Sequence, residues 1–358
     1  MTTRVLALPR YSQAGASSRV RLYQFLGYLG AQGIDVEVQP LLDECYVSQL
    51  LAGGRRSVRH LVRLYGKRIR QLLRSSAADV IWLEKELFPW APEFLDPGLI
   101  GSVPYVVDYD DAIFHNYDEH PNRFLRASFG GKIPKVMRNA VTVVAGNPYI
   151  RDFAAAHGAK RVEVIPSVVD GGKFTPTLRR RSRDAGFTVG WIGSPATQHL
   201  LEPLVAVLAR ELSATGDRFV TIGARFDRPL FGAHQMLTWS EADEARLIAD
   251  FDVGVMPLRD APFERGKCGF KLVQYMACGV PMIASPVGVN SSMVRDGING
   301  FLASSESDWA AAIRSMRTES QRRVAMGVSA RQIFETEYSF AVHAPRFAQI
   351  LRAAAAAR

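Results

Sequence analysis

The residues best suited to chemistry lie in the segment DAPFERGKCGFKLVQYMACGVPMIASPVGVN, at positions 260–290. Gly266 and Gly269 permit a tight turn that brings backbone N–H groups close to a ligand. A helix is predicted over 271–277, and its start favours an anion because the first N–H groups are unpaired and the helix dipole is positive there. The same place carries three cations, Arg265, Lys267 and Lys271. This pattern predicts a site for the diphosphate of a nucleotide, and the alternative is an ordinary loop with solvated lysines.

A second group of reactive side chains follows a strand predicted at 105–108. Asp108 ends this strand, and Asp110 and Asp111 come next in the stretch VVDYDDAIFH. The carboxyl ends of strands in open α/β sheets face the ligand crevice, where clustered acids suit proton handling or the binding of sugar hydroxyls. Histidine titrates near neutral pH, so His115 suits the acceptance of a proton. The catalytic candidates are Asp110, Asp111 and His115, and the alternative for the two acids is a turn-capping role.

Buried strands alternate with helical patterns along the chain, which is typical of α/β folds with parallel sheets. In the first half, strands are predicted at 5–8, 36–39, 80–83, 105–108, 141–145 and 162–165. In the second half, strands are predicted at 188–192, 218–222, 253–256, 282–285 and 300–303. The polar, basic stretch 170–184 is the best candidate for a linker. A length of 358 residues with 47% hydrophobic residues fits two domains.

In its segment 266–290 the chain resembles the retaining glycosyltransferases of family 4, the group 1 glycosyltransferases, which have the GT-B fold. The family pattern is E-x7-E within EGFGLPxLEAMACGxPV, and MACGVPMIAS matches its second part. Both acids are absent, because Gly266 stands at the first glutamate and Gln274 at the second. The resemblance implies that Gln274 hydrogen-bonds the ribose, and that backbone N–H groups or Glu264 contact the donor sugar.

Two further stretches extend the resemblance towards the donor site. GWIGSPATQH, at 190–199, is similar to the family's loop at the diphosphate, and the loop at 14–19 is similar to one beneath the donor phosphates. The loop at 14–19 opens a helix predicted at 20–29, and its alternative role is a serine cap for that helix. The donor-binding residues implied by the resemblance are Gly15, Arg19, Gly193, Ser194, Glu264, Arg265, Gly266, Lys267, Cys268, Gly269, Phe270, Lys271 and Gln274.

The resemblance implies two Rossmann-like, doubly wound parallel-sheet domains that face a cleft. Residues 1–170 are expected to bind the acceptor, with a C-terminal helix at 338–358 packed back on them, and residues 171–337 to bind the nucleotide sugar. The implied activity is transfer of a sugar from a nucleoside diphosphate sugar to a glycan or lipid-linked acceptor in cell-surface polysaccharide or glycolipid synthesis, with retention and without metal or other cofactor. Because the two glutamates are absent, two alternatives stay open: a non-catalytic GT-B protein that binds a nucleotide sugar or glycan, and a GT-B sugar-nucleotide epimerase.

The formal net charge is +9, and the stretch 55–74 carries much of it. Apolar residues recur there at helical spacing, and the other face carries Arg56, Arg59, Arg63, Lys67, Arg70 and Arg74. A basic amphipathic helix suits an anionic membrane surface. The alternative is a helix whose apolar stripe packs on the first sheet while its cations stay solvated. No nucleic-acid-binding motif accompanies this charge, so nucleic acid is not an expected partner.

The three cysteines, Cys45, Cys268 and Cys278, are widely spaced and show no metal-ligand spacing, which indicates reduced thiols. The chain leads directly into its first strand without a leader pattern. No apolar run reaches the ~18 residues of a membrane span. These features predict a cytoplasmic protein, with peripheral attachment to the inner face of the membrane through 55–74.

Overall fold

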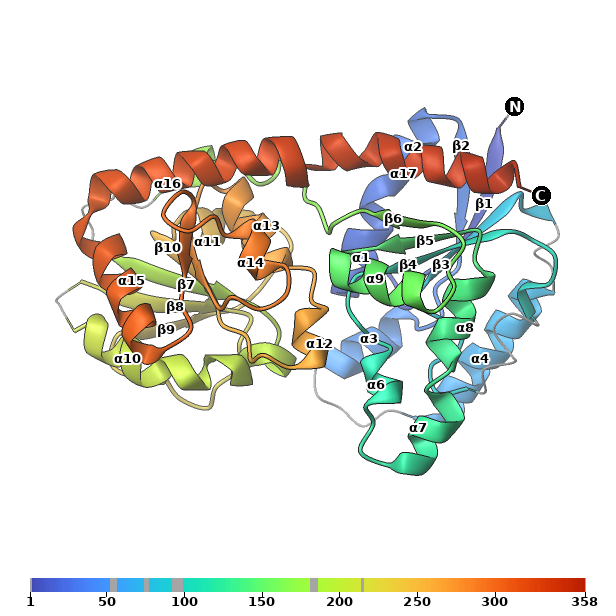
Figure 1. The fold of residues 1–358 in the computed structure, drawn as a ribbon, viewed down its shortest axis with the longest axis horizontal. Helices are drawn as coiled ribbons and strands as arrows, with labels where there is room; N and C mark the ends of the chain where they lie inside the picture. Colours follow the sequence, from blue (N-terminus) through green and yellow to red (C-terminus); the bar gives the residue numbers. More distant parts are fainter. Residues whose placement is uncertain are drawn as a thin grey trace. The chain divides into compact units, whose positions relative to one another are not determined.

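The computed structural model describes residues 2–51, 57–73, 77–91, 99–180, 186–213 and 216–357. Its contacts divide the chain into two compact units. The first comprises Met1–Ser167, Gly266–Cys268 and His343–Arg358, and the second Val168–Arg265 and Gly269–Val342. Each unit contains one six-stranded sheet covered by helices (Figure 1). The α/β fold with two parallel sheets is therefore confirmed, whereas the functional roles assigned to the two domains stay predictions.

The first sheet has the strand order β2-β1-β3-β4-β5-β6, and all neighbouring strands are parallel. Its strands are β1 (Thr3–Leu8), β2 (Ile34–Val38), β3 (Val80–Glu84), β4 (Tyr105–Tyr109), β5 (Thr142–Ala145) and β6 (Val162–Val164). Every strand predicted for the first half is present, within about two residues at either end. The register pairs Glu84 of β3 with Asp108 of β4, so two acids stand side by side at the carboxyl edge of the sheet.

The helices of the first unit lie on both sides of this sheet (Figure 1). Those with described bounds are α1 (Ala16–Arg21), α2 (Leu26–Ala31), α3 (Glu44–Leu51), α4 (Val58–Leu72), α6 (His115–Asp118), α7 (Arg123–Phe129), α8 (Lys132–Asn139), α9 (Pro148–Ala156) and, from His343 onward, α17 (Phe340–Ala355). The predicted C-terminal helix is thus present. The ring of Phe347 in α17 lies 4.5 Å from that of Trp82 and 5.1 Å from that of Phe25, so this helix completes the core of the first unit.

The prediction of one helix over 20–29 was wrong. Helix α1 begins at Ala16 and ends at Arg21, a 3₁₀ turn follows at Tyr23–Phe25, and α2 begins only at Leu26. Leu22 interrupts the helix with φ −131° and ψ −63°. Helix α1 begins earlier in the sequence than predicted because Ser18 and Arg21 are held by buried acids at the sheet edge, as described below.

The basic helix also differs from its prediction. Residues 55, 56 and 74 lie outside the described part of the chain, and α4 spans Val58–Leu72. Its buried face contains Leu64, Arg68 and Leu72, and Arg68 donates hydrogen bonds to the carbonyls of Pro9 and Gln39. Four aliphatic residues of the predicted apolar stripe are exposed, which contradicts the alternative that the whole of this stripe packs on the first sheet: Val58 (75%), Val62 (65%), Ile69 (39%) and Leu73 (74%).

The second sheet has the strand order β12-β11-β10-β7-β8-β9, again wholly parallel. Its strands are β7 (Thr188–Ile192), β8 (Arg218–Ile222), β9 (His234–Leu237), β10 (Val253–Met256), β11 (Met282–Ala284) and β12 (Gly300–Leu302). Five of these strands were predicted, and the edge strand β9 was missed. The sequence of β9 is short and starts with two polar residues, so it carries no strand periodicity.

The helices of the second unit are α10 (Val205–Glu211), α11 (Glu244–Ala249), α12 (Pro262–Arg265), α13 (Phe270–Ala277), α14 (Asn290–Met293), α15 (Glu306–Thr318) and α16 (Ser320–Ile333). Helix α13 confirms the helix predicted at 271–277. It starts directly after Gly269 and ends before Gly279, whose φ of +64° closes the helix. Helix α13 thus begins at a glycine and packs against β10.

Candidate functional site

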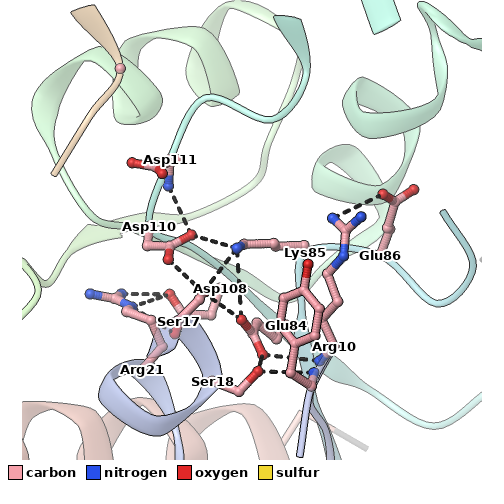
Figure 2. A network of polar contacts seen from close by, with 12 residues as sticks. Arg10, Ser17, Ser18, Arg21, Glu84, Lys85, Glu86, Asp108, Asp110 and Asp111 are labelled. Atoms are coloured by element: carbon pink, nitrogen blue, oxygen red, sulfur yellow. Dashed lines mark hydrogen bonds and ion pairs between the residues drawn. The ribbon is translucent and has the colours of Figure 1, made fainter. Parts of the chain in front are cut away.

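Polar side chains gather where β3 and β4 end in the first unit (Figure 2). Glu84, Lys85 and Asp108 are at most 6% exposed, and Asp110 is 8% exposed. Helix α1 lies against the same edge, because Ser17 and Ser18 hydrogen-bond the Glu84 carboxylate. Carboxyl edges of parallel sheets are where ligands bind in open α/β folds.

Asp110 is bound on several sides. The Lys85 ammonium lies 2.9 Å from Asp110 Oδ1, and the Ser17 hydroxyl lies 2.5 Å from Oδ2. The Asp111 N–H donates to Asp110 Oδ1 at 2.9 Å. Burial alone would raise the pKa of Asp110, but the charge of Lys85 and the hydroxyl of Ser17 outweigh it and hold the pKa below its usual range. Asp110 is therefore ionised at neutral pH.

Asp108 anchors α1 rather than presenting a free carboxylate. The Arg21 Nε lies 3.2 and 3.1 Å from the two carboxylate oxygens, and Arg21 Nη1 donates to the Ile165 carbonyl at 2.9 Å. Burial raises the pKa of Asp108 to about 6, and the Arg21 guanidinium opposes this shift. The pair thus remains charged at neutral pH and fixes the first turn of α1 on the sheet.

Asp111 has a different environment from Asp110. It is half-buried, and the backbone N–H of Cys268 donates a hydrogen bond to its carboxylate. Burial and the negative charge of Asp110 raise the pKa of Asp111, while the charge of Lys267 opposes the rise. Burial, with the charge of Asp111, also raises the pKa of the Cys268 thiol to about 11, so this thiol is protonated at neutral pH. Asp111 is the more basic carboxylate of the two.

Gly266 is needed for packing within the first unit. A Cβ on this residue would lie 2.1 Å from the Ala112 Cβ. The Asn147 side chain, which caps α9, donates its Nδ2–H to the Gly266 carbonyl at 2.8 Å. Glycine is therefore required at position 266 because the segment at Ala112 packs closely against it. Its predicted contact with the donor sugar stays a prediction.

His115 does not join the two acids. Its Nδ1 lies 2.9 Å from Asp118 Oδ1, and its Nε2 lies 2.8 Å from the Tyr149 hydroxyl. In the described part of the chain, no hydrogen bond or ion pair links it to Asp110 or Asp111. Both ring nitrogens are engaged, so uptake of an acceptor proton by His115 would require one of these contacts to break.

In the second unit, the start of α13 forms the second group of candidate residues. Gly269 has φ +66°, and a Cβ there would lie 2.5 Å from Met293 Sδ, so both conformation and space require glycine. Lys271, in the first turn, holds its ammonium 5.3 Å from the ring centroid of Trp191 in β7. Phe270 is half-buried against the core of this unit. Gly269, the helix start and Lys271 are thus brought together, whereas Gly266, Lys267 and Cys268 belong to the first unit.

Gln274 faces a buried acid that sequence reasoning missed. Gln274 is 2% exposed, and its Nε2 lies 3.4 Å from Glu244 Oε2 in α11. The same oxygen accepts the indole N–H of Trp239 at 2.9 Å. A carboxylate is therefore present beside the position of the family's second glutamate, although it comes from another helix. Only the acidic stretch WSEADE hinted at it in the sequence.

The remaining candidates are spread over both units. Arg265 is paired with Asp260 at 2.6 Å on the surface of the second unit, so its charge is partly neutralised there. Gly193 follows β7 and donates its N–H to the Ile222 carbonyl at 3.0 Å, while Ser194 is exposed. Glu264 is half-buried in α12. In the first unit, Gly15 is the N-cap of α1, and Arg19 lies half-buried on that helix.

Among the described residues, no group of three or more histidine, cysteine or acidic side chains is arranged to hold a metal ion. None of the described helices is both long enough and apolar enough to cross a membrane.

Comparison with known proteins gives matches over part of the sequence and over the whole fold. Residues 186–319 match the family model of glycosyl transferases group 1. D-inositol 3-phosphate glycosyltransferase of Paenarthrobacter aurescens is 31% identical over 222 residues, which cover 54% of this chain and 53% of that protein. The match thus spans about half the length of such relatives.

Among solved structures, sucrose-phosphate synthase from Thermosynechococcus elongatus has a TM-score of 0.76 at 16% identity, covering 99% of this chain and 100% of that one. The Anabaena protein HepE, in complex with UDP and glucose, has a TM-score of 0.71 at 18% identity, covering 98% and 100%. With the two parallel sheets, these likenesses define a GT-B fold. The chain is thus similar to the group 1 glycosyl transferases, whose family model covers most of the second unit.

Proposed function

We propose that this chain transfers a sugar from a nucleoside diphosphate sugar to a hydroxyl of a glycan or lipid-linked acceptor, in the synthesis of a cell-surface polysaccharide or glycolipid. The observation that carries the proposal is the start of α13, where Gly269 caps the helix and Lys271 brings an ammonium to its first turn. This helix lies in the segment that matches the family. HepE was solved with UDP and glucose and with UDP-glucose, so UDP sugars are the first donors to test.

The donor diphosphate would lie at the N-terminus of α13. Negative charge builds up on the diphosphate as its bond to the sugar breaks, and fixed N–H groups and an ammonium stabilise that charge. Lys271 is held against the face of the Trp191 ring. This contact limits its motion and therefore the cost of ordering it around a phosphate. Retention of anomeric configuration is proposed from the resemblance to the family alone.

The acceptor hydroxyl would be handled by the two acids after β4. Asp110 is a weak base because its pKa is lowered, so its suitable role is to accept a hydrogen bond and orient the hydroxyl. Asp111, whose pKa is raised, is the better candidate to take the proton. In the proposed reaction, the acceptor oxygen bonds to the anomeric carbon, the bond from that carbon to the diphosphate breaks, and the acceptor proton goes to Asp111.

We also propose peripheral contact with an anionic membrane through α4. Val58, Val62, Ile69 and Leu73 form an exposed aliphatic stripe. Arg59, Arg63, Lys67 and Arg70 are exposed beside it. An aliphatic stripe flanked by cations suits the boundary between acyl chains and acidic headgroups. Such contact would bring the enzyme to a lipid-linked acceptor on the inner face of the membrane.

The proposed function is tested by a thermal-shift screen of the wild-type protein against UDP, GDP, ADP and TDP sugars, followed by product analysis with and without sugar acceptors. At about 100 times the Kd, a true donor should stabilise the protein by about 2.7 kcal/mol. Sugar should then be transferred only when an acceptor is present. Altered or free sugar without an acceptor would indicate an epimerase, and binding without turnover would indicate a non-catalytic protein.

A further inference from the structure

Resting on the proposed function, we propose that Lys85 is a positioning residue: its ammonium, presented by a strained turn at the end of β3, keeps the Asp110 carboxylate charged and in place for the acceptor hydroxyl. Nothing in the sequence pattern marked Lys85, because its partners are 68 and 25 positions away in the chain, at Ser17 and Asp110.

The backbone at Lys85 is unusual. Its φ is +67°, and among the described residues only Trp90 shares a positive φ without being glycine. The Lys85 N–H continues the sheet by donating to the Asp108 carbonyl at 2.9 Å, and the Glu86 N–H then closes a three-residue turn onto the Glu84 carbonyl at 2.9 Å. A γ-turn with positive φ is rare and strained. Such strain persists where surrounding contacts enforce it, and it clusters at functional sites.

The turn delivers the side chain to a defined set of partners (Figure 2). The ammonium lies 2.9 Å from Asp110 Oδ1, 2.9 Å from Ser17 Oγ and 3.8 Å from Glu84 Oε1. The side chain is only 8% exposed. Two of its N–H donors therefore have hydrogen-bond acceptors at 2.9 Å, and the Glu84 carboxylate adds a longer ion-pair contact.

The charges around Asp110 show why this ammonium matters. Asp110 is faced by Glu84 and Lys85 after β3, by Asp108 and Asp111 along its own segment, by Arg21 on α1 and by the Cys268 thiol. Two of these groups are cations, and Arg21 is already bound to Asp108. Without Lys85, Asp110 would be a buried carboxyl among three other acids, and it would take up a proton at a higher pH.

A buried ion pair is not by itself a source of stability, because removing two charges from water costs as much as their attraction returns. The same unit offers a matched case. Lys132 lies 2.9 Å from Glu86 Oε2, with side-chain exposures of 0% and 1%. Lys132 is the first residue of α8, has no positive φ, and contacts Glu86 rather than Asp110. The strained turn and the contact with Asp110 set Lys85 apart from this pair.

The experiment compares Lys85→Met, Lys85→Gly, Lys85→Arg and the control Lys132→Met in the full chain. The first readout is the titration of the Asp110 carboxyl, followed by ¹³C NMR of labelled aspartate and assigned with Asp110→Asn. Its midpoint should rise by about 1–3 pH units in Lys85→Met. Lys85→Gly should show the same rise in the Asp110 midpoint, but it should be more thermally stable than Lys85→Met because glycine tolerates the positive φ of this turn. Lys85→Arg and Lys132→Met should keep the wild-type titration.

The second readout is the pH dependence of transfer. The pH at which kcat is lost on the acid side should rise by the same amount in Lys85→Met, about 1–3 pH units, with the donor KM nearly unchanged, so that this variant is inactive at an acidic pH at which the wild type still works. Its activity should recover as the pH rises. A titration of Asp110 that does not move, or a loss of kcat that is independent of pH, would overturn the positioning role. If Lys85→Met does not fold, the glycine variant provides the same two readouts. Wild-type protein that binds no nucleotide sugar would instead overturn the proposed function, and the positioning role with it.

Discussion

Lys271 is the residue on which the donor proposal can be tested most directly. A hydrogen bond to a charged group contributes about 1.5–3 kcal/mol, so Lys271→Ala should weaken the binding of a nucleoside diphosphate about 10- to 100-fold. Binding of the free nucleoside should change little, because that ligand has no phosphate. Isothermal titration calorimetry measures both.

A matched control exists for Lys271 in the same unit. Lys173 also lies over an aromatic ring, 6.0 Å from the Phe174 centroid, but on an exposed surface where it pairs with Glu241. Lys173→Ala should bind both ligands as the wild type does. An equal loss of diphosphate and nucleoside binding in Lys271→Ala would remove the case for a phosphate contact.

Among single residues, the sequence predicted those whose partners are local. Gly269 and Lys271 are two positions apart at the same helix start, so a short motif contains both. Lys85 and Glu244 act through contacts with residues 25 and 30 positions away, at Asp110 and Gln274. No local pattern contains such a contact. His115 looked reactive by residue type alone, and only the structure shows that Asp118 and Tyr149 bind both of its nitrogens.

At the scale of elements, α4 gives a prediction about membranes. Wild-type protein should sediment with vesicles of anionic phospholipid, ignore neutral vesicles and dissociate as salt rises, since each cation near an anionic surface contributes about 1 kcal/mol. Arg59→Gln with Arg63→Gln and Arg70→Gln should abolish this binding. Val58→Ser with Val62→Ser should weaken it without changing its dependence on lipid charge, because only the aliphatic contact is lost.

Exposed aliphatic residues on another helix provide the control for α4. Val324 and Val328 in α16 are 36% and 55% exposed, and replacing both with serine should leave vesicle binding unchanged. Binding that persists in the triple glutamine variant, or that ignores lipid charge, would show that α4 serves the first unit alone.

The edge strand β9 carries a prediction about pH. His234 Nδ1 accepts the Leu230 N–H at 2.9 Å, and Nε2 lies 2.9 Å from the Thr221 hydroxyl, so the ring is neutral. Burial lowers the pKa of His234 to about 4. Between about pH 6.5 and that value, the unfolded chain binds a proton that the folded chain does not. The free energy of unfolding should therefore fall by on the order of 1–2 kcal/mol as the pH drops through this window.

Urea denaturation at pH 7.5 and pH 5 measures the contribution of His234. His234→Gln should lose this part of the pH dependence, while His199→Gln, at an exposed position of the same unit, should keep it. Identical pH dependence in all three proteins would mean that His234 is protonated in the folded state.

A helix or strand could be predicted from the sequence where its own residues determine its bounds and its buried face. Strands such as Val80–Glu84 and Val253–Met256 are runs of buried apolar residues, and their pattern alone identifies them. The break at Leu22 and the outward stripe of α4 depend on what each helix packs against. Arg68 is buried on α4 because the carbonyls of Pro9 and Gln39 receive it, and helical periodicity alone would place it in solvent.

At the scale of the whole molecule, the positive charge that would attract a diphosphate comes from lysine and arginine side chains. The chain has 44 lysines and arginines against 35 acids, and one of these cations, Lys271, lies at the start of α13, where the diphosphate is proposed to bind. Because this ammonium and the helix N–H groups are proposed to stabilise the leaving diphosphate, we expect transfer to continue in excess EDTA at an undiminished rate. Loss of activity that Mg²⁺ or Mn²⁺ restores would show that a divalent ion takes part of the role proposed for Lys271 and the start of α13.

The packing of α17 on the first unit has a consequence for biosynthesis. Phe25 and Trp82 are made early, yet the ring that lies against both belongs to Phe347. A ribosome adds that residue only after the entire second unit. During translation, the earlier segment therefore lacks one of the rings that pack on Phe25 and Trp82, and the core of the first unit can be completed only after the second unit has been synthesised.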